Sequence, residues 1–226
     1  MTNDRCLILF VKYPEKGKVK SRLAQDLTDN VAAGLYENFV RDIISTLERG
    51  SFSLRIYFYP PEKEEEIKKF LGNNYQYKAQ NGADLGYRMK NAFLQEFAAG
   101  FKDVVLIGSD CPDLPLDIIE ESFNALENHS GSVIGPAADG GYYLIGFLKD
   151  AFCPDIFSGI EWSSSSVFEK TMNILRSKEH QLHILPQWRD LDNLEDLNDL
   201  IKRSKGTSFA DSNTMKFLKD NNFIKQ

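Results

Sequence analysis

Short apolar runs alternate with longer stretches of helical periodicity along most of the chain, and this alternation constrains the fold more than any other feature. The apolar runs are bounded by turn-forming residues and predict strands at 6–12, 53–60, 103–108, 132–135, 142–148 and 181–185. Amphipathic spacing predicts helices at 28–50, 61–72, 84–100, 115–129, 163–178 and 193–203. Thr28 or Asp29 is expected to cap the first of these helices, and Gly50 to end it.

This order favours a three-layer α/β/α sandwich around a mostly parallel, Rossmann-like mixed sheet, because parallel neighbours need crossover connections. The runs at 132–135 and 142–148 are an exception. They are separated only by PAADGG, which is too short for a crossover helix and rich in turn residues. We therefore expect a local antiparallel excursion there.

A chain of 226 residues with 42% hydrophobic residues is long enough to bury one sizeable core. We expect a single domain over residues 1–203. The tail at 204–226 is polar at first and weakly amphipathic later, which predicts a loose helix. This helix would pack on the surface or on a second subunit, so a homodimer is an open alternative.

Charge and cysteine content narrow the class of protein. The net charge of −6 argues against a nucleic-acid or anionic-membrane surface, so any phosphate chemistry needs a local basic site. The N-terminal apolar run is too short for a transmembrane segment or a signal peptide, which predicts a cytoplasmic protein. Three widely spaced cysteines suit reduced thiols better than a disulfide framework or a zinc site.

Ligands of open α/β sheets bind beyond the carboxyl ends of the strands, so the residues that follow each strand are the candidates for a site. The first strand is followed by a basic loop, KYPEKGKVKSRLA, that contains Lys12, Gly17, Lys20 and Arg22. Its backbone amides and cations are suited to a polyphosphate, which we favour over the alternative of a solvated basic turn. The loop matches neither the Walker A nor the GxGxxG pattern.

The strand at 103–108 runs into GSDCPDLP, which places Ser109 and Asp110 at the sheet edge. A carboxylate there is suited to Mg²⁺ or Mn²⁺, because these ions take oxygen ligands together with substrate phosphates. A role in the turn is the alternative for Asp110. Asp113 is expected to cap the helix that begins near Pro115.

Three further stretches carry candidate residues with open alternatives. Asp139 precedes Gly140, Gly141 and Tyr142, and the group suits either a ligand loop or a hairpin turn. Asp192 follows Asp190 before the last predicted helix, as a metal ligand or, like Asn193, as a helix cap. In the loop at 80–92, Gly82 and Asp84 suit a grip on a base or ribose, or a plain N-cap at Asp84.

Taken together, the motifs resemble those of the bacterial nucleotide-diphospho-sugar transferase-like family, and more narrowly its radical-SAM/selenodomain-associated transferase branch. The resemblance spans most of the chain up to Arg203. It rests on K-x-P-x-x-G-x-x-K-S-R-L (12–23), Q-x-G-A-D-L-G-Y-R-M (80–89), G-S-D-C-P-D-L (108–114), D-G-G-Y-Y-L-I-G (139–146), W-S-S-S (162–165) and D-L-D-N-x-x-D-L (190–197).

The resemblance implies a GT-A-type fold with a nucleotide half and an acceptor half. By position it implies that Lys20 and Arg22 contact phosphates and that Asp110 binds the metal, with Asp192 as a weaker second ligand. It assigns the stretch from Asp139 to Tyr142 to the acceptor side. The first loop lacks the consecutive glycines of many sugar nucleotidylyltransferases, and the segment at 108–114 is not a D-x-D motif.

The sequence thus predicts a metal-dependent transferase that acts on a nucleotide-diphospho-sugar and a small-molecule acceptor, with Lys20, Arg22 and Asp110 in catalysis. Lys12, Gly17, Gly82, Asp84 and Ser109 are expected to line the nucleotide. One alternative is nucleotidylyl transfer from an NTP with release of pyrophosphate, since the basic loop is also similar to that of phospholactate guanylyltransferases. A second is a non-catalytic nucleotide-binding module.

Overall fold

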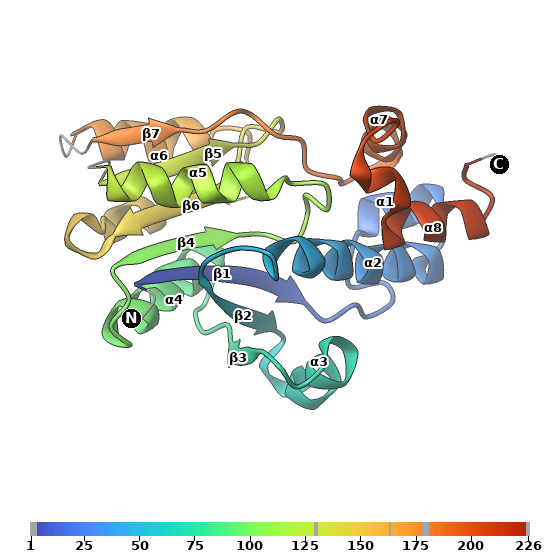
Figure 1. The fold of residues 1–226 in the computed structure, drawn as a ribbon, viewed down its shortest axis with the longest axis horizontal. Helices are drawn as coiled ribbons and strands as arrows, with labels where there is room; N and C mark the ends of the chain where they lie inside the picture. Colours follow the sequence, from blue (N-terminus) through green and yellow to red (C-terminus); the bar gives the residue numbers. More distant parts are fainter. Residues whose placement is uncertain (1–3, 129–130, 163, 178–180, 225–226) are drawn as a thin grey trace.

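Seven strands form one sheet in the order β3-β2-β1-β4-β6-β5-β7, with helices on both faces (Figure 1). The computed structural model describes residues 4–128, 131–162, 164–177 and 181–224. The strands are β1 (Arg5–Lys12), β2 (Ser53–Tyr59), β3 (Gln76–Ala79), β4 (Asp103–Ile107), β5 (Ser132–Pro136), β6 (Tyr142–Leu148) and β7 (Leu182–Ile184). The predicted three-layer α/β/α sandwich is confirmed.

Strand β6 is antiparallel to both of its neighbours, while the other paired strands run parallel. The predicted antiparallel excursion is therefore confirmed. The second strand of this antiparallel pair, β6, lies inside the sheet, where it pairs with β4 from Asp103↔Leu148 to Ile107↔Leu144. As a result, the loop between β5 and β6 opens at the same sheet edge as the loop that follows β4.

The helices are α1 (Ser21–Asp26), α2 (Asp29–Leu47), α3 (Glu64–Leu71), α4 (Leu85–Ala98), α5 (Leu116–Glu127), α6 (Val167–Ser177), α7 (Leu194–Arg203) and α8 (Asn213–Asp220). Thr28 caps α2 by accepting from the Val31 amide, as predicted, but α2 ends at Leu47, before Gly50. Residues 129, 163 and 178, which the predicted helices included, lie outside the described residues. The short elements α1 and β3 were not predicted, because six and four residues are too few to show a period.

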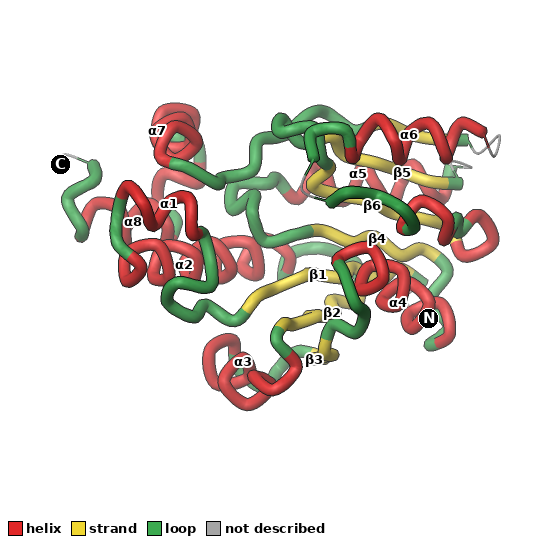
Figure 2. Tube along the Cα trace, turned by 180° about the vertical axis from the view of Figure 1, so that it is seen from behind, coloured by secondary structure: helices red, strands yellow, loops and turns green. Residues whose placement is uncertain are grey.

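Both faces of β1 are covered, and its burial follows the two-residue period of a strand. Leu7, Leu9 and Val11 pack in the cluster that includes residues of α2 and α5, whereas Cys6, Ile8 and Phe10 pack with residues of α4 and α6. The two layers are seen from opposite sides in Figures 1 and 2. None of the helices among the described residues is long and apolar enough to cross a membrane.

The C-terminal tail contributes to the core of its own chain. Met215 and Leu218 of α8 are buried in the larger cluster, and α1, α7 and α8 gather beside α2 in Figure 1. The Asp42 carboxylate of α2 accepts from the backbone amides of Asn213 at 2.9 Å and Thr214 at 2.8 Å. A carboxylate is favoured there because the first amides of a helix have no partner within the helix.

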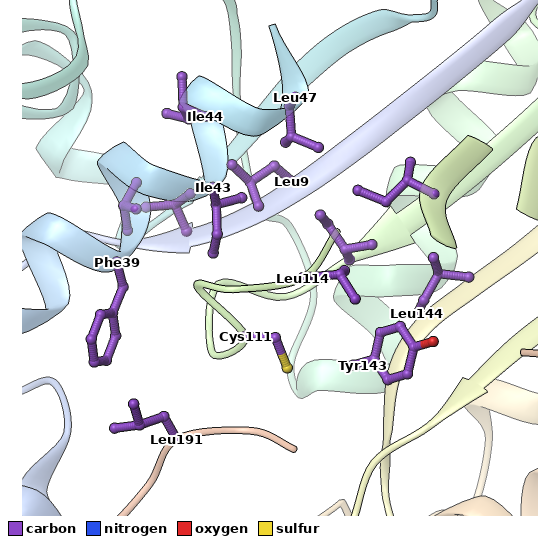
Figure 3. Packing of buried hydrophobic residues seen from close by; sticks show 14 of the residues in the cluster. Leu9, Phe39, Ile43, Ile44, Leu47, Cys111, Leu114, Tyr143, Leu144 and Leu191 are labelled. Atoms are coloured by element: carbon purple, nitrogen blue, oxygen red, sulfur yellow. The ribbon is translucent and has the colours of Figure 1, made fainter. Parts of the chain in front are cut away.

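Cys111 lies in the same cluster, among Leu114, Tyr143 and Leu191 (Figure 3). Burial, followed by the nearby Asp110 carboxylate, raises the pKa of its thiol well above the usual value. Cys6, Cys111 and Cys153 are all buried, and none of them forms a disulfide in the described part of the chain. Cys111 is thus a small core residue in the turn after β4.

Candidate functional site at the carboxyl edge of the sheet

The loop between β7 and α7 crosses the carboxyl edge of the sheet and ties together the loops that follow the other strands. The Leu191 amide donates to the Asp110 carbonyl at 2.9 Å. Further along, the Ala138 amide donates to the Trp188 carbonyl at 3.0 Å. Segments at 108–113, 136–141 and 186–192, which are far apart in sequence, therefore meet at one place.

Lys20 lies at the centre of this site, with only 4% of its side chain exposed. Its Nζ atom forms an ion pair with Asp110 Oδ1 and donates to Asp192 Oδ1 at 3.0 Å and to the Leu191 carbonyl at 2.6 Å. Burial alone would lower the pKa of Lys20, but Asp110 and Asp192 outweigh it and raise the pKa above its usual value. The ammonium is thus held charged between two carboxylates.

The backbone of Lys20 adopts the left-handed conformation, with φ 48° and ψ 46°. It is one of two non-glycine residues with positive φ among those described, the other being Asn222. This conformation costs a lysine ~1–2 kcal/mol, and such residues persist where the surrounding contacts hold them. The Lys20 carbonyl accepts from the Ala24 amide at 2.9 Å, and its Nζ atom has three acceptors, so both the backbone and the side chain of this residue are held.

Asp110 and Asp192 have half-exposed side chains, at 52% and 39%, so a ligand can reach both. Within the part of the chain that the structure describes, no group of three or more His, Cys, Asp or Glu side chains is placed to hold a metal ion. Two carboxylates nevertheless fit Mg²⁺ or Mn²⁺, because such ions take one or two of them together with water and substrate phosphates. A cation here would depend on a phosphate to complete its ligands.

Ser109 is buried and its hydroxyl contacts Tyr36 Oη at 2.6 Å, while the Lys12 amide donates to the same Tyr36 oxygen at 3.0 Å. Burial, with the charge of Asp110 next, raises the pKa of Tyr36 to about 12. The phenol therefore stays neutral and links the turns after β1 and β4. The sequence analysis did not identify Tyr36, because its position fits the apolar face of α2. Only its hydroxyl group distinguishes it from the apolar residues of that face.

The remaining cations of the basic loop are exposed. Lys12, Lys16 and Lys18 form no ion pair within the described residues, and Arg22, with a 75% exposed side chain, lies 3.9 Å from Asp192 Oδ2. Gly17, at φ 72°, follows Lys16 in the turn that the Lys18 amide closes onto the Glu15 carbonyl. The basic loop thus carries exposed positive charge both before and after the buried Lys20.

Gly82 and Asp84 have structural roles at the start of α4. The Asp84 carboxylate accepts from the Tyr87 amide at 2.9 Å, which confirms the capping alternative. Gly82, at φ 150°, has no room for a side chain, since a Cβ would lie 2.6 Å from the Arg88 nitrogen. Its carbonyl accepts from Arg88 Nε at 3.1 Å.

The loop between β5 and β6 is a tight turn packed against the segment before α6. Asp139 Oδ1 accepts from the Gly141 amide at 2.8 Å. Gly140, at φ 92°, would place a Cβ 2.1 Å from the Ser165 carbonyl oxygen. Tyr142 contacts Trp162 edge to face, with their ring centroids 6.3 Å apart.

Asp190 also lies at this edge of the sheet, although the sequence analysis names it only as a neighbour of Asp192. Burial, with Asp139 and then Asp192 adding repulsion, raises the pKa of Asp190 to about 6. The charges of Asp139, Asp192 and Lys20 therefore all act on Asp190. No spacing rule in the sequence identifies this group, because it depends on how two loops pack.

The predicted cap at Asp113 is wrong. The N-cap of α5 is Pro115, and no side chain caps it. Asp113 instead accepts from Arg203 Nε at 2.7 Å and Nη2 at 3.1 Å, and from Trp188 Nε1 at 3.2 Å. The pair with Arg203 at the end of α7 stabilises the Asp113 carboxylate more than the free backbone amides at the start of α5 would.

Comparisons with known proteins show the family and the fold of this chain. A family model described as "Uncharacterized protein conserved in bacteria (DUF2064)" matches residues 43–164. The crystal structure of a "putative nucleotide-diphospho-sugar transferase" from Desulfovibrio desulfuricans G20 is 42% identical, covers 98% of this chain and 96% of that chain, and superimposes with a TM-score of 0.95. No curated protein matches the sequence.

More distant solved structures share the fold alone. A 4-diphosphocytidyl-2C-methyl-D-erythritol synthase from Anaerococcus prevotii DSM 20548 is 12% identical over 88% of this chain and 96% of that chain, with a TM-score of 0.57. Rv0371c from Mycobacterium tuberculosis H37Rv, crystallised with manganese, is 12% identical over 89% of this chain and 99% of that chain, with a TM-score of 0.53.

Proposed function

The chain belongs to the DUF2064 family and has the fold of a nucleotide-diphospho-sugar transferase, and on that basis we propose that it transfers a group from a nucleotide-activated donor to a small-molecule acceptor. The observation that carries the proposal is the position of Lys20 between Asp110 and Asp192, at the carboxyl edge of the sheet. Ligands bind at this edge in open α/β sheets.

Each part of the reaction has a candidate group in this chain. The phosphates of the donor lie over the basic loop, where Lys12 and Arg22 face solvent and attract negative charge. A divalent cation held by Asp110 and Asp192 would neutralise charge that develops on the departing phosphate. The turn from Asp139 to Tyr142, with Asp190 beside it, borders the acceptor.

We assign the donor as a nucleotide-diphospho-sugar. Its acceptor attacks the anomeric carbon, the bond to the phosphate oxygen breaks, and a nucleoside diphosphate leaves. The charge of the basic loop favours a second candidate, nucleotidylyl transfer from an NTP. In that reaction the acceptor attacks the α-phosphorus and pyrophosphate leaves, so four cations at Lys12, Lys16, Lys18 and Arg22 would suit the larger polyphosphate charge.

A thermal-shift screen tests the proposal. The purified chain is heated with UDP-, GDP- and dTDP-sugars and with the four NTPs, each with and without Mg²⁺ or Mn²⁺. A nucleotide that binds the native state raises the melting temperature by mass action. Product analysis with that nucleotide then separates release of nucleoside diphosphate from release of pyrophosphate. No stabilisation by any nucleotide at about millimolar concentration contradicts the proposal, and stabilisation without turnover indicates a binding module.

A further inference from the structure

The ammonium of Lys20 uses its full hydrogen-bonding capacity within the protein. An ammonium has three N–H donors, and those of Lys20 have three acceptors, on Asp110, Asp192 and Leu191. In this arrangement Lys20 has no donor left for a phosphate. The contact with phosphate that the sequence predicts for Lys20 therefore requires the side chain to move.

The same ammonium occupies the space between the two carboxylates that would hold a divalent cation. It contacts Oδ1 of Asp110 and Oδ1 of Asp192, so a cation that bridges the two carboxylates at these oxygens would have to displace it. A doubly charged ion beside the buried Lys20 ammonium would be repelled, because two positive charges at close range raise each other's energy. Metal and lysine thus compete for Asp110 and Asp192.

The exposed cations of the basic loop indicate where the Lys20 side chain would find new acceptors. Exposed cations at Lys12, Lys16, Lys18 and Arg22 attract a polyphosphate to the loop that carries Lys20. An anion there offers the ammonium new acceptors, while the metal that accompanies a nucleotide replaces it at the carboxylates.

From these observations we infer that Lys20 blocks the metal position in the free protein and exchanges Asp110 and Asp192 for the phosphates of an incoming nucleotide. This inference rests on the proposed function and adds to it that metal and nucleotide bind cooperatively. Linkage then requires each to strengthen binding of the other. Lys20 acts in this scheme as a positioning residue for Asp110 and Asp192 and as a competitor of the metal.

The test uses Lys20→Met, which removes the charge and keeps an unbranched side chain. With Mn²⁺ as the only ligand, titration calorimetry or electron paramagnetic resonance is expected to show an increase in affinity of about tenfold or more over wild type. In EDTA, the affinity of the same variant for the stabilising nucleotide is expected to fall by a similar factor. A merely structural lysine would not produce opposite changes.

Two further variants test whether the effect depends on the contact between Lys20 and Asp110. Lys18→Met removes the same charge from the same loop but leaves the pair with Asp110 intact, so its Mn²⁺ affinity is expected to remain near that of wild type. Adding Asp110→Asn to Lys20→Met is expected to remove the gain. If Lys20→Met does not fold, Lys20→Gln, which retains donors for Leu191, is measured in its place.

The outcomes separate the inference from the function. A folded Lys20 variant that binds Mn²⁺ no more tightly than wild type overturns the inference, even where a nucleotide stabilises the wild-type protein and the proposed function stands. Unchanged nucleotide affinity in EDTA overturns it as well. If Mn²⁺ affinity rises but no nucleotide binds wild type, the competition at Asp110 stands, and both the proposed function and the exchange with phosphate fail.

Discussion

Lys20 and Asp192, 172 positions apart in the sequence, are joined by a hydrogen bond of 3.0 Å between Nζ and Oδ1. Through this contact the loop after the first strand meets the loop before α7, and Asp110 completes the group from the end of β4. The candidate site thus draws one charged residue from each of three distant segments, and its parts can be tested separately.

Asp110→Asn is expected to reduce turnover by about 10²–10³-fold, because one preorganised charged group near the departing phosphate is lost. The side chain is half exposed, so the fold should be retained. Steady-state rates on the donor identified by thermal shift, with circular dichroism for the fold, provide the measurement. Asp150→Asn, an exposed carboxylate away from the site, is the matched control. Near-normal turnover in Asp110→Asn would remove this residue from the mechanism.

Gly140→Ala is expected to destabilise the turn beside the acceptor, because its Cβ would lie 2.1 Å from the Ser165 carbonyl oxygen and φ is 92°. We expect a loss of ~1–3 kcal/mol in the free energy of unfolding, with reduced turnover. Gly206→Ala is the control, since φ there is 78° and nothing lies within 4 Å of the added carbon. Equal losses in the two variants would mean that strain alone, and no clash, decides the effect.

Asp113→Ala and Arg203→Ala are each expected to lower the free energy of unfolding by ~2 kcal/mol, because a partly buried, bidentate ion pair is broken. Urea denaturation of the two single variants and the double variant completes a double-mutant cycle. A coupling free energy of about 1 kcal/mol or more supports the pairing. Additive losses would instead show that the two residues act independently.

Asp42→Ala is expected to lower the free energy of unfolding by ~2 kcal/mol, because the α8 amides of Asn213 and Thr214 lose a charged acceptor. Asp42→Asn keeps one acceptor oxygen and should lose about half as much. Both values come from urea melts, with Asp211→Asn, an exposed carboxylate of the same tail, as the control. A loss in Asp42→Ala no larger than in that control would contradict the role of Asp42 in docking α8.

Asp103 leads to a prediction about pH. Burial, and then the Glu127 carboxylate, raise the pKa of Asp103 above its usual value, although Arg5 and Lys102 act in the opposite direction. An acid with a higher pKa in the folded state binds more protons folded than unfolded, so its ionisation lowers stability as pH rises through the folded pKa. Asp103→Asn should therefore gain stability relative to wild type at neutral pH.

Comparing the stability of Asp103→Asn with that of wild type at low pH checks the sign of this charge effect. Below the usual Asp pKa of about 3.9 the carboxyl is neutral in both states, and the gain in Asp103→Asn should vanish. Urea denaturation from about pH 3 to about pH 8 measures both limits, with Asp150→Asn as the exposed control. A gain in stability that does not depend on pH would point to packing instead of charge.

The periodicity of the sequence determined most of the architecture. Alternating apolar runs and amphipathic stretches predicted six of the strands and the long helices, since burial on one face repeats every two residues in a strand and about every 3.6 in a helix. The short loop PAADGG predicted the antiparallel pair, because only a turn fits six residues. Resemblance of the ordered motifs predicted the family.

Only the tertiary structure decided which charges meet. Lys20 appeared in the sequence as one cation of a basic loop, yet it is buried against Asp110 and Asp192, while its neighbours Lys16 and Lys18 remain exposed. Asp113 has a partner 90 positions away in Arg203. An ion pair depends on the distance between atoms in space, and for residues this far apart the packing of the loops sets that distance.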